Sequence, residues 1–250
     1  MYQDNIKHMK NSFKIIFTTS LLLAFSFGAQ AQKNKRKKGK EAERTINYKV
    51  EAETDADMLK PMLTMMSGAF MRTEIKGEKS KVVMDMKVSE NVTITDKKEE
   101  KGLILVSVPM QGMRYAAQMT KEDFQPDTTN TDTVIVTYYK DKTKEIAGHQ
   151  CTKVLVVVKN KSDMKTKEET TMYVALDLAP ISKGKFGKHV NGTPLLIEMT
   201  NSTPYGDMVI TMTASSITDS VDKDTDFSTK VPEGYEVKTM EEIKAMSGGK

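Results

Sequence analysis

Apolar and polar positions alternate through most of the chain from residue 45 onward. In the segment 45–51, TINYKVE, Ile46, Tyr48 and Val50 share one face and polar side chains occupy the other. This period of two is typical of a half-buried β-strand. Further strand-like segments cover residues 69–75, 81–88, 91–95, 103–108, 112–119, 134–140, 151–159, 169–176, 195–200 and 207–217. Polar turns separate them, so the sequence predicts roughly ten antiparallel strands.

One segment has helical spacing instead. In residues 55–68, DADMLKPMLTMMSG, apolar side chains recur at intervals of three and four, at Met58, Leu59, Met62, Leu63 and Met66. An aspartate at position 55 or 57 is expected to cap the start, and Gly68 to mark the end. Pro61 restricts the regular part to its C-terminal side or kinks it. The chain ends in an extended arm and one or two further helical turns.

The apolar face of such a sheet must be covered. A single short helix cannot cover so wide a sheet, and no second set of strands remains to build a sandwich. We therefore predict a mainly β protein with one or two short helices, in which a strongly curved antiparallel sheet forms an incomplete, half-open barrel around a helix. Such a shape leaves an apolar concavity in which a small apolar ligand would bind.

The predicted inner face is rich in methionine. The chain has 19 Met and no Trp. Methionine fills irregular gaps and suits surfaces that accept varied apolar partners, although it is also ordinary core filling. Copper binding by thioethers is a weaker reading, because the M-x-M at 84–86 lies on a sheet face. The candidate ligand lining is Met58, Met62, Met66, Met71, Met84, Met86, Met199 and Met212.

The start of the chain has the features of a secretory signal. The basic residues Lys7, Lys10 and Lys14 precede an apolar run over residues 15–27, and Ala29-Gln30-Ala31 provides a cleavage site. We predict a signal peptide over residues 1–31, with the true start at Met1 or Met9. No cysteine follows the cut site directly, so the exported protein is expected in the periplasm or outside the cell, without a lipid anchor.

Residues 32–44 are charged and lack periodicity, which predicts a basic disordered tether before a single domain over residues 45–246. The whole chain carries +4, of which the predicted signal contributes +2 and residues 33–40 contribute +6, leaving −4 for residues 41–250. A mildly acidic domain argues against nucleic-acid binding. The tether is either a solvated linker or a contact to an anionic membrane surface. The basic residues expected to make this contact are Lys33, Lys35, Arg36, Lys37, Lys38 and Lys40.

The residues capable of chemistry are few. Cys151 is the only cysteine, so it cannot form an internal disulfide, and we expect it to be buried. His149 lies two residues earlier on the same strand face, roughly 6.5 Å away, which is a loose fit for a hydrogen-bonded dyad. Three Asn-x-Thr triplets, at 91, 191 and 201, are short enough to arise by chance. We predict no enzyme activity, no catalytic residue, no metal and no cofactor.

Several short motifs resemble an uncharacterised family of exported bacterial proteins with a domain of unknown function. The motifs are Lys144-x-Ile146-x-Gly148-His149-x-Cys151-x-Lys153, the turn Gly192-Thr193-Pro194, and the ending Phe227…Val231-Pro232-x-Gly234-Tyr235 with Met240-Glu241-Glu242. Together they span most of residues 45–245, with histidine at position 149 where the family has an aromatic residue. The family is similar in architecture to periplasmic lipoprotein carriers and receptors, so the resemblance implies a half-open barrel in the cell envelope.

The combined expectation is a non-enzymatic binding or carrier module for an apolar, lipid-like ligand. The alternative is a structural or protein-interaction domain of the cell envelope with a solid core. The sequence does not define the ligand, the protein partner or the oligomeric state.

Overall fold

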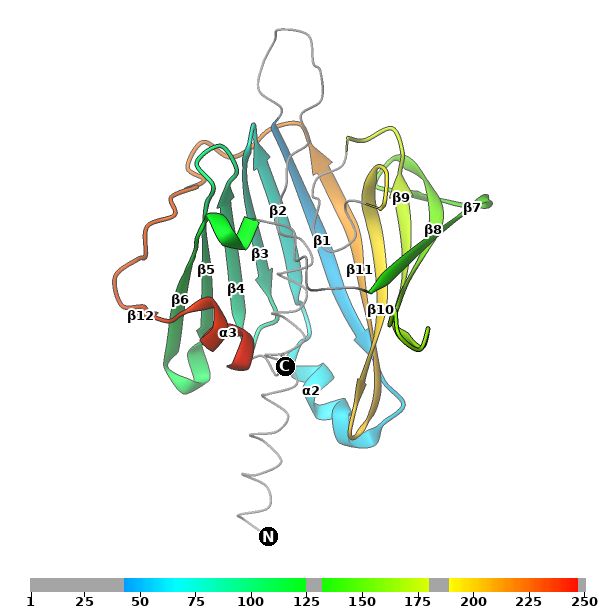
Figure 1. The fold of residues 1–250 in the computed structure, drawn as a ribbon, viewed down its shortest axis with the longest axis horizontal. Helices are drawn as coiled ribbons and strands as arrows, with labels where there is room; N and C mark the ends of the chain where they lie inside the picture. Colours follow the sequence, from blue (N-terminus) through cyan, green and yellow to red (C-terminus); the bar gives the residue numbers. More distant parts are fainter. Residues whose placement is uncertain (1–42, 125–131, 180–188, 247–250) are drawn as a thin grey trace, which may run out of the picture.

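The computed structural model describes residues 43–124, 132–179 and 189–246. The sheet has twelve strands (Figure 1). They are β1 (Glu43–Glu53), β2 (Phe70–Lys76), β3 (Lys79–Asp85), β4 (Glu90–Asp96), β5 (Lys101–Val108), β6 (Met113–Met119), β7 (Thr133–Ile146), β8 (His149–Lys159), β9 (Thr166–Ala175), β10 (Thr193–Thr203), β11 (Gly206–Thr218) and β12 (Glu236–Val237). The helical elements are η1 (Asp57–Leu59), α2 (Lys60–Met65), η2 (Pro109–Gln111), η3 (Lys121–Phe124) and α3 (Met240–Met246).

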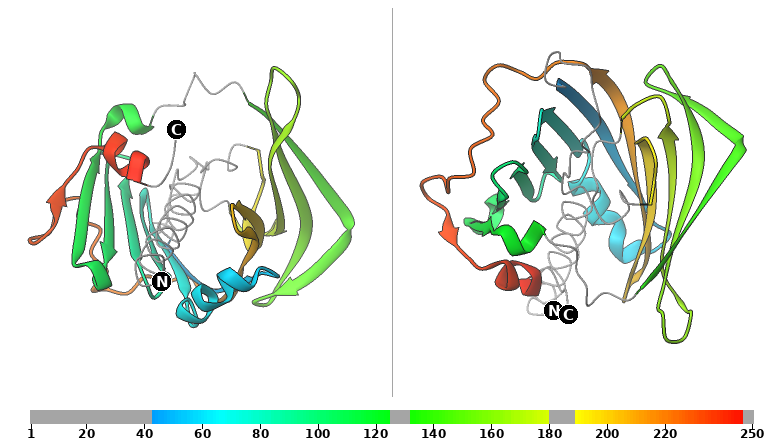
Figure 2. Two further views of the ribbon diagram at one scale, coloured as in Figure 1. Left: turned by 90° about the horizontal axis from the view of Figure 1, so that it is seen from below. Right: turned by 45° about the horizontal axis from the view of Figure 1, so that its top comes forward.

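The strands form one open, curved layer in the order β12-β6-β5-β4-β3-β2-β1-β11-β10-β9-β8-β7. Neighbouring strands are antiparallel except β12, which runs parallel to β6. The layer bends until its two edges face each other, but β12 and β7 are not paired, so the barrel stays open (Figure 2). The predicted class, a mainly β protein with a curved, incomplete barrel and short helices, is confirmed.

The short helical segment lies at the end of the sheet where β1 ends and β2 begins (Figure 1). Leu59, Met62 and Met66 are buried there and pack into the main core. Pro61 occupies the first turn of α2, where its missing N–H leaves no hydrogen bond unmade. The predicted aspartate cap is wrong, because neither η1 nor α2 has a side-chain cap.

The C-terminal segment covers both faces of the same strands. After β11 it crosses the convex face, where Phe227, Val231 and Tyr235 pack against apolar side chains of β4–β6. It then pairs with the β6 edge as β12, and α3 packs on the concave face through Met240 and Ile243. Alternation predicts a single apolar face for each strand, whereas β5 and β6 carry buried apolar side chains on both faces.

The start of α3 has a reciprocal capping box. The Glu242 backbone N–H donates to the Thr239 hydroxyl at 3.1 Å, and the Thr239 N–H donates to the Glu242 carboxylate at 2.7 Å. These bonds hold the pKa of Glu242 below its usual value. The cap explains why so short a helix forms directly after an extended arm.

The first described strand includes two residues that the prediction assigned to the tether. Glu43 and Arg44 belong to β1, and the domain bounds stay a prediction. The predicted signal peptide, residues 32–42 of the tether and its six basic residues lie outside the described residues. Within the described ranges, no helix is long and apolar enough to cross a membrane.

Candidate functional site

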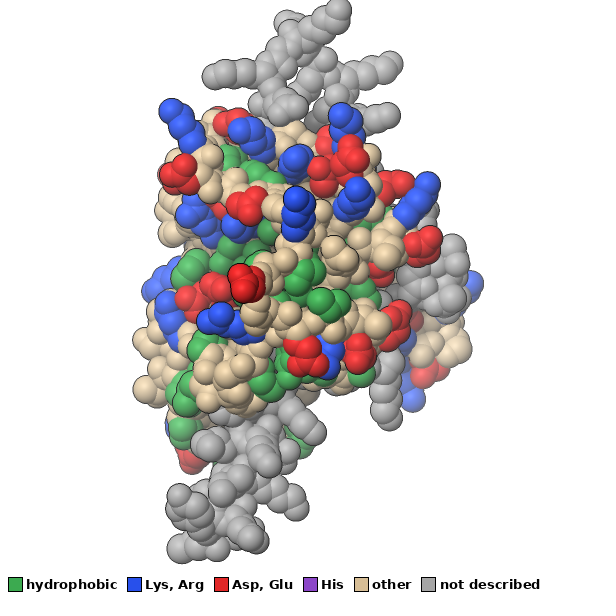
Figure 3. Space-filling model, turned by 90° about the vertical axis from the view of Figure 1, so that its left-hand side faces the viewer, with side chains coloured by type: hydrophobic (Ala, Val, Ile, Leu, Met, Phe, Trp, Pro, Cys, Tyr) green, Lys and Arg blue, Asp and Glu red, His purple; other side chains and the backbone are tan. Residues whose placement is uncertain are grey.

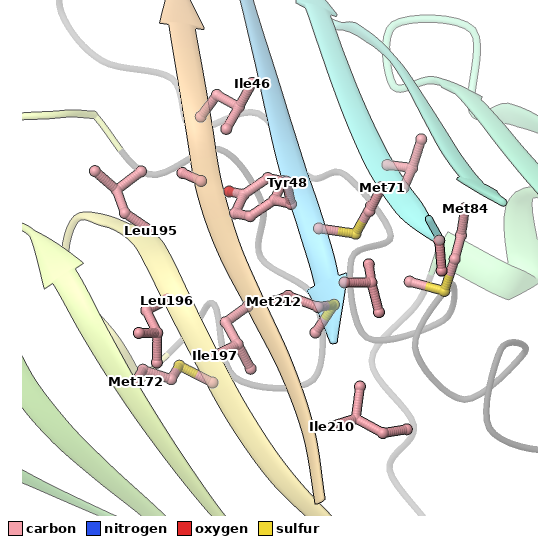
Figure 4. Close-up of a cluster of buried hydrophobic side chains, with 14 of the residues drawn as sticks. Ile46, Tyr48, Met71, Met84, Met172, Leu195, Leu196, Ile197, Ile210 and Met212 are labelled. Atoms are coloured by element: carbon pink, nitrogen blue, oxygen red, sulfur yellow. The ribbon is translucent and has the colours of Figure 1, made fainter. Parts of the chain in front are cut away.

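The candidate site is the concave face of the sheet. Cross-strand register places Met84 of β3 opposite Met71 of β2, and Met71 opposite Tyr48 of β1. A second row runs from Val50 through Met212, Ile197 and Met172 to Val154, crossing five strands. Figure 4 shows several of these side chains on one side of the ribbon. The result is a continuous apolar face across neighbouring strands of the sheet, in the spatial order β3-β2-β1-β11-β10-β9-β8.

Six of the eight predicted lining residues lie in this core. Met62, Met66, Met71, Met84, Met86 and Met212 are at most 5% exposed. Met199 is half-buried and packs against the same cluster. The structure brings these seven side chains together, and their contact with a ligand remains a proposal.

The eighth, Met58, lies outside this buried cluster. Its side chain is 58% exposed. It lies in the 3-10 turn η1, where the spacing of three residues per turn replaces the 3.6 on which the prediction relied. Met58 is therefore not packed with the other seven, and its contact with a ligand also stays a proposal.

The polar groups at the upper part of this face are largely paired. Tyr48 donates its hydroxyl to the Pro194 carbonyl at 2.9 Å, and burial raises the pKa of that hydroxyl. The Arg44 guanidinium contacts Asp219 at 3.5 Å and the Ala179 carbonyl at 3.4 Å. A ligand beside Tyr48 would meet an apolar ring whose polar end is already satisfied.

Strand β4 carries a polar stripe on its concave face that alternation alone does not predict. Asn91, Thr93 and Thr95 face the concavity, because Asn91 lies opposite Met84 and Val106 in the ladder. Thr95 bonds to Ser80 at 2.8 Å. The apolar residues of this strand, Val92 and Ile94, contribute instead to the cluster on the convex face. Asn91 is 1% exposed, so its Asn-x-Thr triplet is not an accessible glycan acceptor.

The pair His149 and Cys151 does not form a dyad. The His149 ring bonds through Nδ1 to Asp177 at 2.8 Å, whereas the Cys151 thiol faces the His149 backbone carbonyl at 3.4 Å. Cys151 is buried as predicted, and burial raises the pKa of its thiol to about 11. A thiol with that pKa is a poor nucleophile at neutral pH. Within the described residues, no cluster of metal-ligating side chains occurs.

A polar hollow of about 260 Å³ lies on the convex face, over β9 and β10. It is lined by Thr166, Lys167, Glu168, Glu169, Thr171, Glu198, Thr200 and Ser202. Lys167 is paired with Asp132 at 2.7 Å. Hydroxyls and carboxylates of this kind suit water better than an apolar ligand.

The outer surface carries charges of both signs. Figure 3 shows the side that carries the β6 edge, where basic and acidic side chains are interspersed and apolar ones lie between them. Pairs such as Lys238–Glu236 and Lys121–Glu100 neutralise each other locally. An extended basic face of the kind that binds nucleic acid is not seen on this side.

Fold and site together define an open β half-barrel with an apolar concave face. No protein-family model and no curated protein matches the chain in sequence. In structure it is similar to a domain named as an outer membrane lipoprotein-sorting protein from Vibrio parahaemolyticus, with 10% identity over 74% of this chain and 89% of that chain, and a TM-score of 0.33. It is also similar to a LolA superfamily protein from Nitrosomonas europaea, with 9% identity over 72% and 87%, and a TM-score of 0.27.

At this level of similarity, neither the ligand nor the activity of those proteins transfers to this chain. The motif around Cys151 is not matched by a family model, so the resemblance based on it stays a prediction.

Proposed function

We propose that this protein is a non-enzymatic, exported binding or carrier module for an apolar, lipid-like ligand. The supporting observation is the methionine-rich concave face, which is continuous across β3, β2, β1, β11, β10, β9 and β8. The two edge strands of this sheet are not paired with each other. Unbranched thioether side chains can repack around chains of different shape. An open sheet can also widen without breaking a hydrogen-bond ladder.

Binding is tested with the fluorescent apolar probe N-phenyl-1-naphthylamine and by native mass spectrometry after gentle purification. A ligand that binds the native state raises its stability, so acyl lipids should both displace the probe and raise Tm. A clean mass, no probe binding and no shift in Tm would overturn the proposal.

Two variants localise the site. Met84→Gln places an amide within the concave face and should weaken probe binding about tenfold or more, because a buried amide without a partner is unfavourable. Met110→Gln changes a side chain that is 69% exposed and should bind as the wild type does. Circular dichroism establishes that both variants are folded. Equal binding by both variants would place the probe elsewhere.

A second candidate is a structural or protein-interaction domain of the cell envelope. The observation in its favour is the nearly complete burial of six lining methionines, as expected for a solid core. It predicts no probe binding together with a co-purifying protein partner.

The basic residues Lys33, Lys35, Arg36, Lys37, Lys38 and Lys40 are compatible with either function. Attraction to anionic vesicles that disappears at high salt would identify them as a membrane contact.

A further inference from the structure

Asn91 combines deep burial with a complete lack of hydrogen-bond partners. Its side chain is 1% exposed, and both its amide nitrogen and its amide oxygen are unpaired. The hydroxyl of Thr93, two residues along β4 on the same face, is also buried and unpaired. Buried polar side chains in folded proteins are nearly always paired, with protein, water or ligand. An unpaired buried amide costs about 1–3 kcal/mol, so this arrangement needs an explanation.

The surroundings of the two side chains are apolar on both sides. Asn91 lies between Met84 and Val106, and Thr93 lies between Val82 and Ile104. All four of these neighbours are at most 2% exposed. The polar atoms therefore form a small island in the lining of the proposed ligand site.

Resting on the proposed function, we propose that Asn91 and Thr93 bind the neutral polar linkage of an acyl ligand, an ester or amide beside a hydroxyl. The Asn91 amide nitrogen would donate to the ligand carbonyl. The Asn91 oxygen would accept a hydrogen bond from the adjacent N–H or O–H of the ligand, and the Thr93 hydroxyl would donate to or accept from a ligand hydroxyl. The hydrocarbon chain would lie along the methionine rows toward β1 and β11.

A neutral linkage fits better than a carboxylate or a phosphate. The cross-strand neighbours of both residues are uncharged. The basic side chain on the concave face of β1, Arg44, is already in contact with Asp219. Burying an anion without a compensating charge is far less favourable than burying a neutral polar group.

The test compares three ligands with one oleoyl chain: monooleoylglycerol, N-oleoylethanolamine and oleate. The affinity of each ligand is measured by displacement of N-phenyl-1-naphthylamine from four proteins: the wild type, Asn91→Leu, Thr93→Val and Thr170→Val. Thr170→Val is the matched control. The Thr170 hydroxyl is equally buried and unpaired, but β9 is separated from β4 by five strands of the sheet. Thr93→Val is nearly isosteric, so it reports even if Asn91→Leu folds poorly.

The wild type should bind the ester or the amide ligand more tightly than oleate. Asn91→Leu should weaken binding of that ligand about tenfold and Thr93→Val about threefold, in line with the loss of neutral hydrogen bonds in an apolar site. Binding of the probe itself should not change, and Thr170→Val should behave as the wild type. A preference for the ester over the amide, or the reverse, would identify the linkage.

Three outcomes overturn the inference. Unchanged ligand affinity in Asn91→Leu, with raised thermal stability, would mean that only a buried water occupies this place. An equal loss in Thr170→Val would mean that the effect is not local, and tighter binding of oleate would exclude a neutral linkage. In each case probe binding persists and the carrier proposal stands. If the wild type binds neither probe nor lipid, both proposals fail.

Discussion

At the scale of single residues, Cys151 shows how burial sets reactivity. The thiol is fully buried, and its pKa is raised to about 11 because the thiolate would be poorly solvated and would lie near Asp177. An exposed cysteine has a pKa of about 8.5. At pH 8 the native thiol should therefore react with iodoacetamide about a hundredfold more slowly than the unfolded chain. Mass spectrometry with and without denaturant measures this ratio, and rapid labelling of the native protein would contradict it.

The raised pKa of the Cys151 thiol also determines how stability changes with pH. Between pH 8.5 and 11 the folded thiol keeps a proton that the unfolded thiol releases, so the free energy of unfolding should fall as pH rises through this range. Replacing the thiol in Cys151→Val should flatten that part of the curve. An unchanged slope in urea titrations of the variant would show that the thiol does not contribute.

Residue identity alone located the methionines but not Asn91. A strand pattern such as that of residues 45–51 has one apolar side, which must be the buried one. In residues 91–95, NVTIT, the apolar side is also buried, but under the C-terminal arm on the convex face. The polar side then faces the concavity. Which face a segment from the other end of the chain will cover cannot be inferred from the alternation of that strand.

At the scale of elements, two glycines with positive φ are predicted to differ in how much stability the protein loses when each is replaced by alanine. Gly148 (φ +80) lies in the β7–β8 turn, and a Cβ there meets nothing within 4 Å. Gly192 (φ +97) precedes β10, and a Cβ there would lie 2.5 Å from the Ala175 carbonyl oxygen and 2.8 Å from a Val174 methyl group. Gly148→Ala should cost about 1 kcal/mol, and Gly192→Ala clearly more, because backbone clash adds to strain.

Urea denaturation of the two glycine variants gives both values directly. Equal losses would mean that the approach of β9 to Gly192 relaxes without cost. The sequence placed turns at both positions, but it could not show that only one of them is pressed against a neighbouring strand.

The continuous apolar run in β5 indicates a strand that is buried on both faces, which an alternating pattern does not. Leu103, Ile104, Leu105 and Val106 are all buried, which is expected of a strand covered on both faces. Such a run predicts that both faces of the strand are covered, but it does not show which segments cover them. Here α3 is one cover and the arm around Phe227 is the other, and both come from residues more than 100 positions away.

At the scale of the whole molecule, the open sheet depends on its C-terminal segment as a clamp. The arm, β12 and α3 wrap one edge, so strands β5 and β6 are held from both faces while the β7 edge has no such cover among the described residues. The sequence predicted the curvature and the open edges, because the number of strands exceeds what one short helix can cover. The wrap itself follows from tertiary contacts and was not predicted.

Two truncations separate the covers. Ending the chain after Lys238 removes α3 and exposes Ile104 and Val106 on the concave face, yet leaves the arm in place. Ending it after Ser220 also removes the arm, together with the hydrogen bond from Thr225 to the buried Glu74. The first protein should stay folded with a more accessible concave face. The second should lose about 3 kcal/mol or more in the free energy of unfolding, because several large apolar contacts disappear.

Urea denaturation and binding of an apolar dye distinguish these results. If α3 covers part of the ligand site, the shorter truncation should raise the rate at which N-phenyl-1-naphthylamine enters without lowering its affinity. A slower or unchanged rate would mean that ligands enter from the β7 side, and that α3 holds strands rather than guarding the concave face. A longer truncation as stable as the full chain would show that the arm does not stabilise the strands it covers.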